Sequence, residues 1–542
     1  MINGKDIKPQ DMGKPAEQLT KFAELMDLPA PYNKPGMEPP LTEPKDAWKE
    51  KFCASLDGYI GIDTLTRPAT KEEEEEQVKK FLSGLEKIFS NETNRNFIQP
   101  LLLSFEYCAK CNTCSEACHV FQASGRHEMY RPIFRSEVLR RIAKKHFKKG
   151  GGLFEKFVGA DIDINWETIA RLGELAYRCN LCRRCAQTCP LGLDNALLAR
   201  EIRKIFSQEM GIAPKPLHEK GTVLQLKTGS STGITKPAFL DNIEFIEEDI
   251  EEKTGKKIKI PIDKKGADIL LTHNAGEFMA WPENPAAFAI IFEEAGLDWT
   301  LSSDLLGYDN VNYGIWYDDA QAKKIALQQF KVAKDLGVNR LVLGECGHAH
   351  KAAAVSADRL FTGEDYVPRE SFLPLLWDLI KNNKLKLDPS KNSFPVTLHD
   401  PCNVVRMMGV VQPQREIIKA VCPQFREMTP HGVHNYCCGG GSGFAIMNAM
   451  NFSEFRNKVS ARMKFKQILD AFQDTIENPA VPKYVCAPCS NCKGAIRDIL
   501  EFYEVTDKFN VHYGGLVELV VNALVDLEKP YLEFLRDDED DF

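Results

Sequence analysis

The residues of this chain best suited to chemistry are its 17 cysteines, most of which stand in short groups. The stretches 108–118 and 179–189 share the spacing C-x2-C-x2-C-x3-C, and a proline follows the second. At this spacing three thiolates bind three irons of one four-iron cubane, while the fourth cysteine reaches across to the other cluster. Zinc, the alternative metal, favours two C-x2-C pairs. The spacing therefore predicts two cubane [4Fe–4S] clusters. Their expected ligands are Cys108, Cys111, Cys114 and Cys189 for cluster 1, and Cys179, Cys182, Cys185 and Cys118 for cluster 2.

A different cysteine site is indicated at residues 435–443, where the sequence reads NYCCGGGSG. Adjacent cysteines do not suit one ordinary tetrahedral metal site, but they can hold neighbouring or shared iron atoms. Glycine lets backbone N–H groups approach a bulky ligand where a side chain would collide. The stretch therefore predicts an unusual inorganic centre at Cys437 and Cys438, cradled by glycine. The cradle consists of Gly439, Gly440, Gly441 and Gly443.

The two cubane motifs must be positioned by helices. Residues 136–147 and 195–210 carry apolar side chains at helical spacing, which predicts a helical ferredoxin-like module over 91–213. Before it, residues 1–90 form a helical and extended N-terminal extension, in which Thr70 and Glu73 form a capping box for a helix over 71–90. Residues 214–265 are rich in Lys, Gly, Thr and Pro, and are expected to be a surface connector.

From residue 266 onward short apolar strands alternate with helices, which is typical of an α/β fold. The overall prediction is an α plus α/β protein with two related half-domains, 266–390 and 391–542. Strands are expected at 267–272, 340–343, 395–398 and 484–485, and helices at 285–295, 319–336, 414–421 and 455–472.

The two half-domains share local sequence. LLTHN at 270–274 corresponds to VTLHD at 396–400, and VLGEC at 342–346 corresponds to VCAPC at 485–489. The first half has only Cys346, and NYG at 312–314 stands near the place expected for a cysteine pair. One thiolate cannot hold a cluster, so the first half is predicted to be a degenerate copy that serves as scaffold and as one wall of a cleft.

Composition excludes several classes of protein. With 542 residues, 43% hydrophobic and 27% charged, the chain is expected to be globular, and its net charge of −8 argues against a nucleic-acid binder. The polar opening residues and the lack of a long apolar run predict a cytoplasmic protein without a membrane span. The apolar run 516–527 is expected to be a buried helix, the acidic end 536–542 a solvated tail, and Cys53 and Cys422 small buried hydrophobes.

On these motifs the chain resembles the heterodisulfide-reductase-type proteins that join a two-cluster ferredoxin module to a cysteine-rich CCG domain. Within that family it is most similar to the DsrK-type subunits of the DsrMKJOP membrane complexes of sulfate reducers, with HdrD-type subunits next. The resemblance implies a noncubane [4Fe–4S] centre. Its five ligands would be Cys402, Cys437, Cys438, Cys489 and Cys492, while the extra Cys486 leaves open which two of the last three cysteines bind.

The resemblance also implies an oxidoreductase acting on sulfur groups in dissimilatory sulfate or sulfite reduction. Electrons would come from a DsrM-like haem b membrane subunit among other complex subunits, and would reduce a disulfide or the trisulfide of a small DsrC-like sulfur carrier. The chain would lie at the inner face of the cytoplasmic membrane, held there by its partners. Histidine titrates near neutral pH, so His399, His431, His434 and His350 are candidate proton donors, each with a structural role as the alternative.

Two other functions fit the same motifs. One is a CCG-type subunit of a hydroxy-acid or glycerol 3-phosphate oxidase complex, although no strand here is followed by the nucleotide-binding G-x-G-x-x-G of a flavoprotein. The other is a noncatalytic, quinone-linked electron relay whose CCG site is structural or binds zinc. Arg406 and Lys493 are further candidates to stabilise thiolates, with solvated surface as the alternative.

Overall fold

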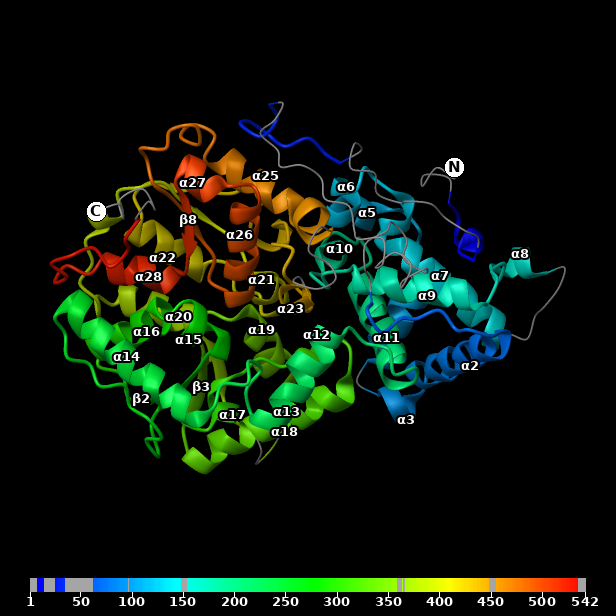
Figure 1. The fold of residues 1–542 in the computed structure, drawn as a ribbon, viewed down its shortest axis with the longest axis horizontal. Coiled ribbons are helices and arrows are strands. Elements are labelled where there is room, and N and C mark those ends of the chain that lie inside the picture. The colour runs from blue at the N-terminus through cyan, green and yellow to red at the C-terminus, as the bar shows by residue number, and fades with distance from the viewer. Residues whose placement is uncertain are drawn as a thin grey trace.

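The computed structural model describes residues 7–13, 25–34, 62–95, 97–147, 154–357, 363, 366–447 and 455–534. Cys53 and the acidic end therefore lie outside the described residues. Figure 1 shows a helical module, in blue to teal, beside two α/β units, the first mainly green and the second yellow to red. Among the described residues no helix is both long and apolar enough to cross a bilayer.

The helical module begins with α2 (Lys71–Ile88), where the Thr70 hydroxyl accepts the Glu73 N–H at 3.2 Å, as the capping prediction requires. Helix α7 (Pro132–Phe147) and helix α11 (Asn195–Gln208) fall where they were predicted. The remaining elements of the N-terminal part are η2 (Pro9–Asp11), α3 (Asn91–Asn94), α4 (Ile98–Glu106), α5 (Thr113–Ala117), α6 (His119–Ala123), η4 (Glu128–Tyr130), α8 (Glu155–Val158), α9 (Trp166–Tyr177) and α10 (Arg184–Gln187).

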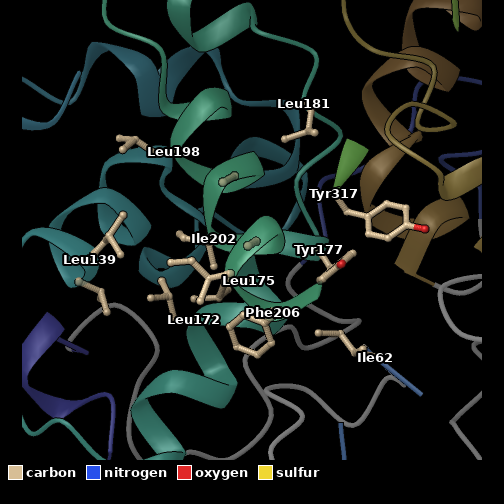
Figure 2. Close-up of a cluster of buried hydrophobic side chains, with 14 of the residues drawn as sticks. Ile62, Leu139, Leu172, Leu175, Tyr177, Leu181, Leu198, Ile202, Phe206 and Tyr317 are labelled. Atoms are coloured by element: carbon tan, nitrogen blue, oxygen red, sulfur yellow. The ribbon is translucent and has the colours of Figure 1, made fainter. Parts of the chain in front are cut away.

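The core of this module is the packing of α11 on α9. Leu198, Ile202 and Phe206 of α11 are fully buried in one core with Leu172 and Leu175 of α9, and Figure 2 shows Ile202 and Phe206 beside these two leucines. The two helices approach closely because Gly173 has no side chain: a Cβ there would stand 2.3 Å from the Phe206 ring. Burying each such leucine or phenylalanine contributes about 1.5–3 kcal/mol, so this seam fixes the motif loops at its ends.

The segment 214–265 is not the surface connector that composition suggested. It folds into α12 (Lys215–Leu217), η5 (His218–Val223), α13 (Leu224–Thr228) and α14 (Lys236–Thr254). Helix α14 buries Phe239, Ile243, Ile246 and Ile250 in the core of the α/β units. These four residues have helical spacing. The prediction of a connector was based on composition, which charged residues and glycines dominate in this segment.

The first α/β unit is built on a four-stranded parallel sheet of order β2-β1-β3-β4. Its strands are β1 (Ile269–Thr272), β2 (Trp299–Thr300), β3 (Arg340–Leu343) and β4 (Arg369–Ser371). Its helices are α15 (Ala275–Ala280), α16 (Glu283–Glu294), α17 (Leu305–Tyr308), η6 (Tyr313–Trp316), α18 (Asp319–Leu336), α19 (Gly347–Ala349), η7 (His350–Ser356), α20 (Phe372–Lys381) and η10 (Pro389–Asn392).

The second α/β unit repeats this topology with the parallel order β6-β5-β7-β8. Its strands are β5 (Val396–Leu398), β6 (Phe425–Arg426), β7 (Lys483–Cys486) and β8 (Val511–Gly514). Its helices are α21 (Cys402–Met407), α22 (Pro413–Val421), η11 (Gly432–His434), α23 (Phe444–Met447), η13 (Arg456–Ser460), α25 (Arg462–Ala471), α26 (Ser490–Phe502), α27 (Val505–Phe509) and α28 (Leu516–Asn522). The prediction of two related α/β halves is confirmed.

The carboxyl ends of the central strands of the two sheets face one another. The Ser490 N–H after β7 donates to the Glu345 carbonyl after β3 at 2.7 Å, and the Asn274 amide after β1 donates to the Ser490 hydroxyl at 3.0 Å. In open parallel sheets, ligands bind beyond the carboxyl ends of the strands, where the strand order reverses. Both units therefore direct that edge toward one shared region.

A buried group of charged side chains lies between the two α/β units. The Lys493 ammonium lies 3.4 Å from Glu277, 3.7 Å from Glu518 and 3.9 Å from Glu345. Glu345 also accepts the backbone N–H groups of Leu516 at 2.6 Å and Val517 at 3.1 Å, the first turn of α28. Burial raises the pKa of Glu345 to about 8. This carboxyl group thus ties the second unit to the first.

We expect Glu345→Ala to lower the thermal unfolding midpoint of the intact protein. The substitution leaves two buried N–H groups without an acceptor, which costs about 1–3 kcal/mol. Glu244→Ala, at an exposed position of α14, is the control and should not change the midpoint. Equal midpoints for Glu345→Ala and the unsubstituted protein would contradict the role given to this carboxyl group.

Candidate iron–sulfur site

The CCG cysteines are carried by three loops of the second α/β unit. Cys402 begins α21 directly after β5, and Cys437 and Cys438 follow η11. Cys489 is the N-cap of α26 and Cys492 lies in its first turn, after β7. Cys402 is half-buried and the other four are buried. All five thus lie at the strand ends where the topology directs ligands.

The structure brings these five thiols into one continuous group. The Cys437 thiol contacts those of Cys402 and Cys438. Cys438 Sγ lies 3.3 Å from Cys492 Sγ, and Cys492 in turn contacts Cys489. All of the described cysteines are free thiols. Such a dense, buried set of soft sulfur donors fits an iron–sulfur group.

Cys486 points elsewhere. It is the last residue of β7 and packs in the apolar core that the two sheets share, together with Cys422 and Tyr484. Burial and the Glu345 charge raise its pKa well above the usual thiol value. The other CCG thiols of this loop belong to a different cluster, with Val485 and Ala487. The alternation of side chains along a strand separates Cys486 from the site.

The glycine run is shaped by close contacts on both sides. The N–H groups of Gly439 and Gly440 donate to the sulfurs of Cys437 and Cys438, each at 3.4 Å. A Cβ on Gly440 would stand 2.9 Å from the Asn491 carbonyl of α26, and one on Gly441 would stand 3.0 Å from the Asn180 carbonyl. The run therefore supplies hydrogen bonds to thiolates and admits two neighbouring backbones.

His399 is the one candidate proton donor, of the four histidines considered, that faces the thiols. A ring nitrogen of His399 lies within 4.8 Å of the sulfurs of Cys438 and Cys492. Its Nε2 has no hydrogen-bond partner among the described residues, while the Asn435 amide group Nδ2 lies 3.4 Å from Nδ1. Burial lowers the pKa of His399.

Lys464 fixes the orientation of this arrangement, and sequence reasoning missed it. Its buried ammonium donates to Asn435 Oδ1 at 2.7 Å, so Asn435 Nδ2 is the atom that faces His399. Nδ1 of His399 therefore accepts, and the proton of the neutral ring resides on Nε2, toward the thiols. Lys464 lies in α25, within the helix predicted over 455–472, where a lysine is normally solvated and carries no signal of its role.

The other predicted charged residues have different roles. His431 and His434 are exposed. His350 is buried 2.8 Å from the Cys346 carbonyl and 2.8 Å from the Ser371 hydroxyl, which is a structural position. Lys493 faces the buried carboxylates instead of the thiols, and Arg406 donates to backbone carbonyls. The alternative interpretation of Lys493 and Arg406 as solvated surface residues is wrong, because both side chains are buried.

The cysteines of the two ferredoxin motifs form two groups across the motifs. Burial raises the pKa of Cys114, and the charges of Cys108 and Cys189 raise it further. Burial also raises the pKa of Cys185, and the charges of its neighbours raise it further. These neighbours include Cys179, Cys182 and Cys118. Cys111 is exposed at the outer edge of the first group. These neighbours match the crossed pairing of the two motifs, in which Cys189 and Cys118 exchange places.

The second motif is in direct contact with the CCG loop. The thiols of Cys182 and Cys437 contact each other, and this contact lowers the pKa of Cys182 and raises that of Cys437. The Asn180 amide group donates to the Gly439 carbonyl at 2.9 Å. Ser442 Oγ donates to the Cys179 carbonyl at 2.9 Å. Cluster 2 would therefore be the nearer of the two cubanes to the CCG site.

Three buried arginines reinforce this junction. Arg203 donates to the carbonyls of Cys179 and Ser442, and Arg406 donates to the Cys182 carbonyl at 3.0 Å. Arg184 donates to the His434 carbonyl at 2.6 Å and lies over the Tyr436 ring. Since each guanidinium spans both modules, the two loops are held in one fixed relation.

The first α/β unit contributes a wall. Its Gly347 N–H donates to Cys489 Sγ at 3.3 Å. At the place corresponding to the cysteine pair, Val311 and Tyr313 pack on Cys346 and fill the space with apolar side chains. This unit therefore supports the site of its neighbour, and among the described residues it has no second cysteine beside Cys346.

Comparison with known proteins agrees with this geometry. Residues 104–193 match the 4Fe-4S dicluster domain, and residues 396–497 match the cysteine-rich CCG domain. The chain is 25% identical over 356 residues to a subunit of the dihydromethanophenazine:CoB–CoM heterodisulfide reductase of Methanosarcina acetivorans, a match that covers 64% of this chain and 81% of the relative. The chain thus contains a 4Fe-4S dicluster domain and a CCG domain, and it is similar to heterodisulfide-reductase-type proteins.

Two further relatives of this CCG-domain protein cover more of its length. The Hdr-like menaquinol oxidoreductase iron-sulfur subunit 2 of Archaeoglobus fulgidus is 26% identical over 478 residues, or 80% of this chain and 81% of the relative. The EtfAB:quinone oxidoreductase of Syntrophomonas wolfei is 22% identical over 438 residues, or 76% of this chain and 57% of the relative. The similarity thus extends through both α/β units.

We expect Cys486→Ser and Cys489→Ser to differ in iron content. Cys489 belongs to the thiol group, so its loss should remove about four iron atoms per CCG-domain chain. Cys486 lies in the core, so its replacement should leave the iron content unchanged. The measurement is iron and labile sulfide per chain after anaerobic purification. Loss of iron from Cys486→Ser alone would reverse the assignment of the two cysteines.

Proposed function

We propose that this chain is the catalytic iron–sulfur subunit of a membrane-associated respiratory complex that reduces a disulfide or trisulfide. The observation that carries the proposal is the contact between Cys182 of the second cubane motif and Cys437 of the CCG site. In this proposal electrons enter near the exposed Cys111, pass through the two cubane motifs, and reach the CCG site through this contact. The relatives named for menaquinol oxidation and for heterodisulfide reduction support both ends of this path.

In this proposal the chain binds three clusters. Cys108, Cys111, Cys114 and Cys189 hold the first cubane, Cys179, Cys182, Cys185 and Cys118 hold the second, and Cys402, Cys437, Cys438, Cys489 and Cys492 hold a noncubane [4Fe–4S] centre. When bound, these groups supply one-electron transfer and iron that can bind sulfur. The N–H groups of Gly439 and Gly440 stabilise the paired thiolates at 3.4 Å.

The chain's own residues supply protons and exclude water. Cleavage of a disulfide by two electrons, which the membrane partner would supply one at a time, leaves two thiolates, and each becomes a thiol by taking one proton. His399 holds a proton on Nε2 beside Cys438, oriented through Asn435 by Lys464. The Gly347 N–H and the apolar packing around Cys346 shield the inner side, while the half-buried Cys402 marks the side nearest solvent.

The partners follow from the same proposal. Electrons would enter from a haem b membrane subunit of the DsrM type, with other complex subunits, since the relative from Archaeoglobus fulgidus is named as one subunit of a menaquinol oxidoreductase. The substrate would be a sulfur bridge on a small DsrC-like carrier protein in dissimilatory sulfate reduction. The chain would then work at the inner face of the cytoplasmic membrane.

We expect the purified protein to contain about 12 iron atoms and a matching amount of labile sulfide per chain. Incubation of the oxidised protein with a DsrC-like carrier should produce a new paramagnetic signal. A Cys437→Ser variant should lose turnover and this signal yet retain about eight iron atoms. About eight iron atoms with one zinc in the unsubstituted protein would instead support a structural CCG site and a relay, as in the quinone-linked alternative.

We further expect His399→Phe to lower turnover of a trisulfide substrate by about 100-fold, the lower range for loss of a general acid. Reduced methyl viologen serves as the electron donor, so that partner subunits are not required. His431→Ala, at an exposed position, is the matched control and should retain full turnover. Equal turnover by His399→Phe, at unchanged iron content, would eliminate His399 as the proton donor.

A further inference from the structure

A cavity of about 990 Å³ lies between the helical module and the first α/β unit. Its walls include Leu103 of α4, Leu197 of α11, Ile315 of η6 and Val355 of η7. Cavities of roughly 300–1,000 Å³ are those that hold small molecules. None of the roles described above for the cysteine sites uses this space.

The charges around the cavity are unequal. Its described lining has more cationic than acidic side chains: Arg95, Arg183, Arg200, Lys204, Lys323 and Lys351 against Glu92, Asp194 and Asp319. Asp194 is paired with Arg183 at 2.7 Å, and Asp319 is paired with Lys204 at 2.8 Å and with Arg200. Both of these acids are therefore already satisfied by cations of the same wall.

Lys351 is the unpaired cation inside the cavity. Its ammonium lies 4.3 Å from the centre of the Trp316 ring, and in the described part of the chain it forms no ion pair, although the charge of Asp194 acts on it from a longer distance. Desolvation, followed by the charges of Arg200 and Arg183, lowers the pKa of Lys351 to about 7. Arg95 and Lys323, which are exposed, stand at the rim.

Much of the remaining wall is apolar, with uncharged polar side chains among it: Thr93, Asn94, Ser104, Gln208, Asn312 and Ser356. Leu181, Leu193 and Met407 line the cavity, and Met407 Sδ accepts a hydrogen bond from Arg183 at 2.8 Å. An occupant would thus meet aliphatic side chains together with the Lys351 ammonium. A concave apolar wall with a few fixed polar groups is the usual composition of a small-molecule site.

We propose that this cavity binds a small organic anion with an apolar body, whose acidic group pairs with Lys351. The site is separate from the cysteine group and does not depend on the proposed sulfur chemistry. It adjoins both redox sites, however, because Leu181 and Arg183 flank Cys182, and Met407 ends the helix that Cys402 begins. An occupant would therefore contact the loops of the second cubane site and the CCG site together.

The test uses two probes that differ by one charged group. 8-Anilinonaphthalene-1-sulfonate has an aromatic body and a sulfonate, and N-phenyl-1-naphthylamine has the same body without it. Equilibrium dialysis of the cluster-loaded full chain should show one saturable site for the sulfonate. Lys351→Met should weaken its binding about tenfold or more, the effect of losing one charged hydrogen bond, and leave the uncharged probe unaffected.

Three comparisons complete the experiment. Lys351→Arg keeps the charge and should keep most of the affinity, while Lys324→Met, at an exposed position outside the cavity, should bind as the unsubstituted chain does. An unchanged thermal midpoint for Lys351→Met shows that the fold is intact. The proposal is overturned if the sulfonate does not saturate, if Lys351→Met binds it normally, or if both probes weaken equally.

Discussion

The contact between the loop of the second cubane motif and the glycine-rich CCG loop is the constraint on which the rest of this structure depends. It joins residues far apart in the chain through backbone carbonyls, such as that of Gly439, which accepts from Asn180. Carbonyls cannot be titrated or screened by salt, so a junction made from them keeps its geometry under varied conditions. Burying Arg203 and Arg406 is costly, and the fixed carbonyls compensate by satisfying their donors.

The repeated α/β unit explains how so many cysteines can lie inside one region without exposing it. Two parallel sheets of the same order place their carboxyl ends against each other. One copy carries the thiols, and in the other Val311 and Tyr313 pack around Cys346. The degenerate copy is therefore a lining for its neighbour, and its buried Glu345 reaches the N-terminus of α28 to lock the pair together.

Much of this architecture could be predicted from the sequence because cysteine spacing and strand periodicity are local signals. The two halves, and helices such as α18, fall where periodicity placed them. The direction in which a side chain points could not be predicted from these local signals. Cys486 and Cys489 are three residues apart in one motif, yet only Cys489 points toward the other thiols. Lys464 and Lys493 were missed or misassigned because a buried lysine has the same sequence appearance as a solvated one.

The glycines at 439–441 also depend on the neighbours of the CCG domain, because different neighbours leave no room for a side chain at different positions. Gly440 is constrained by α26 of its own domain, whereas Gly441 is constrained by the Asn180 carbonyl of the ferredoxin module. A CCG domain that never packs against such a module would be free to carry alanine at the second position but not at the first. In related chains, the residue at that single position would thus indicate whether the two modules are docked.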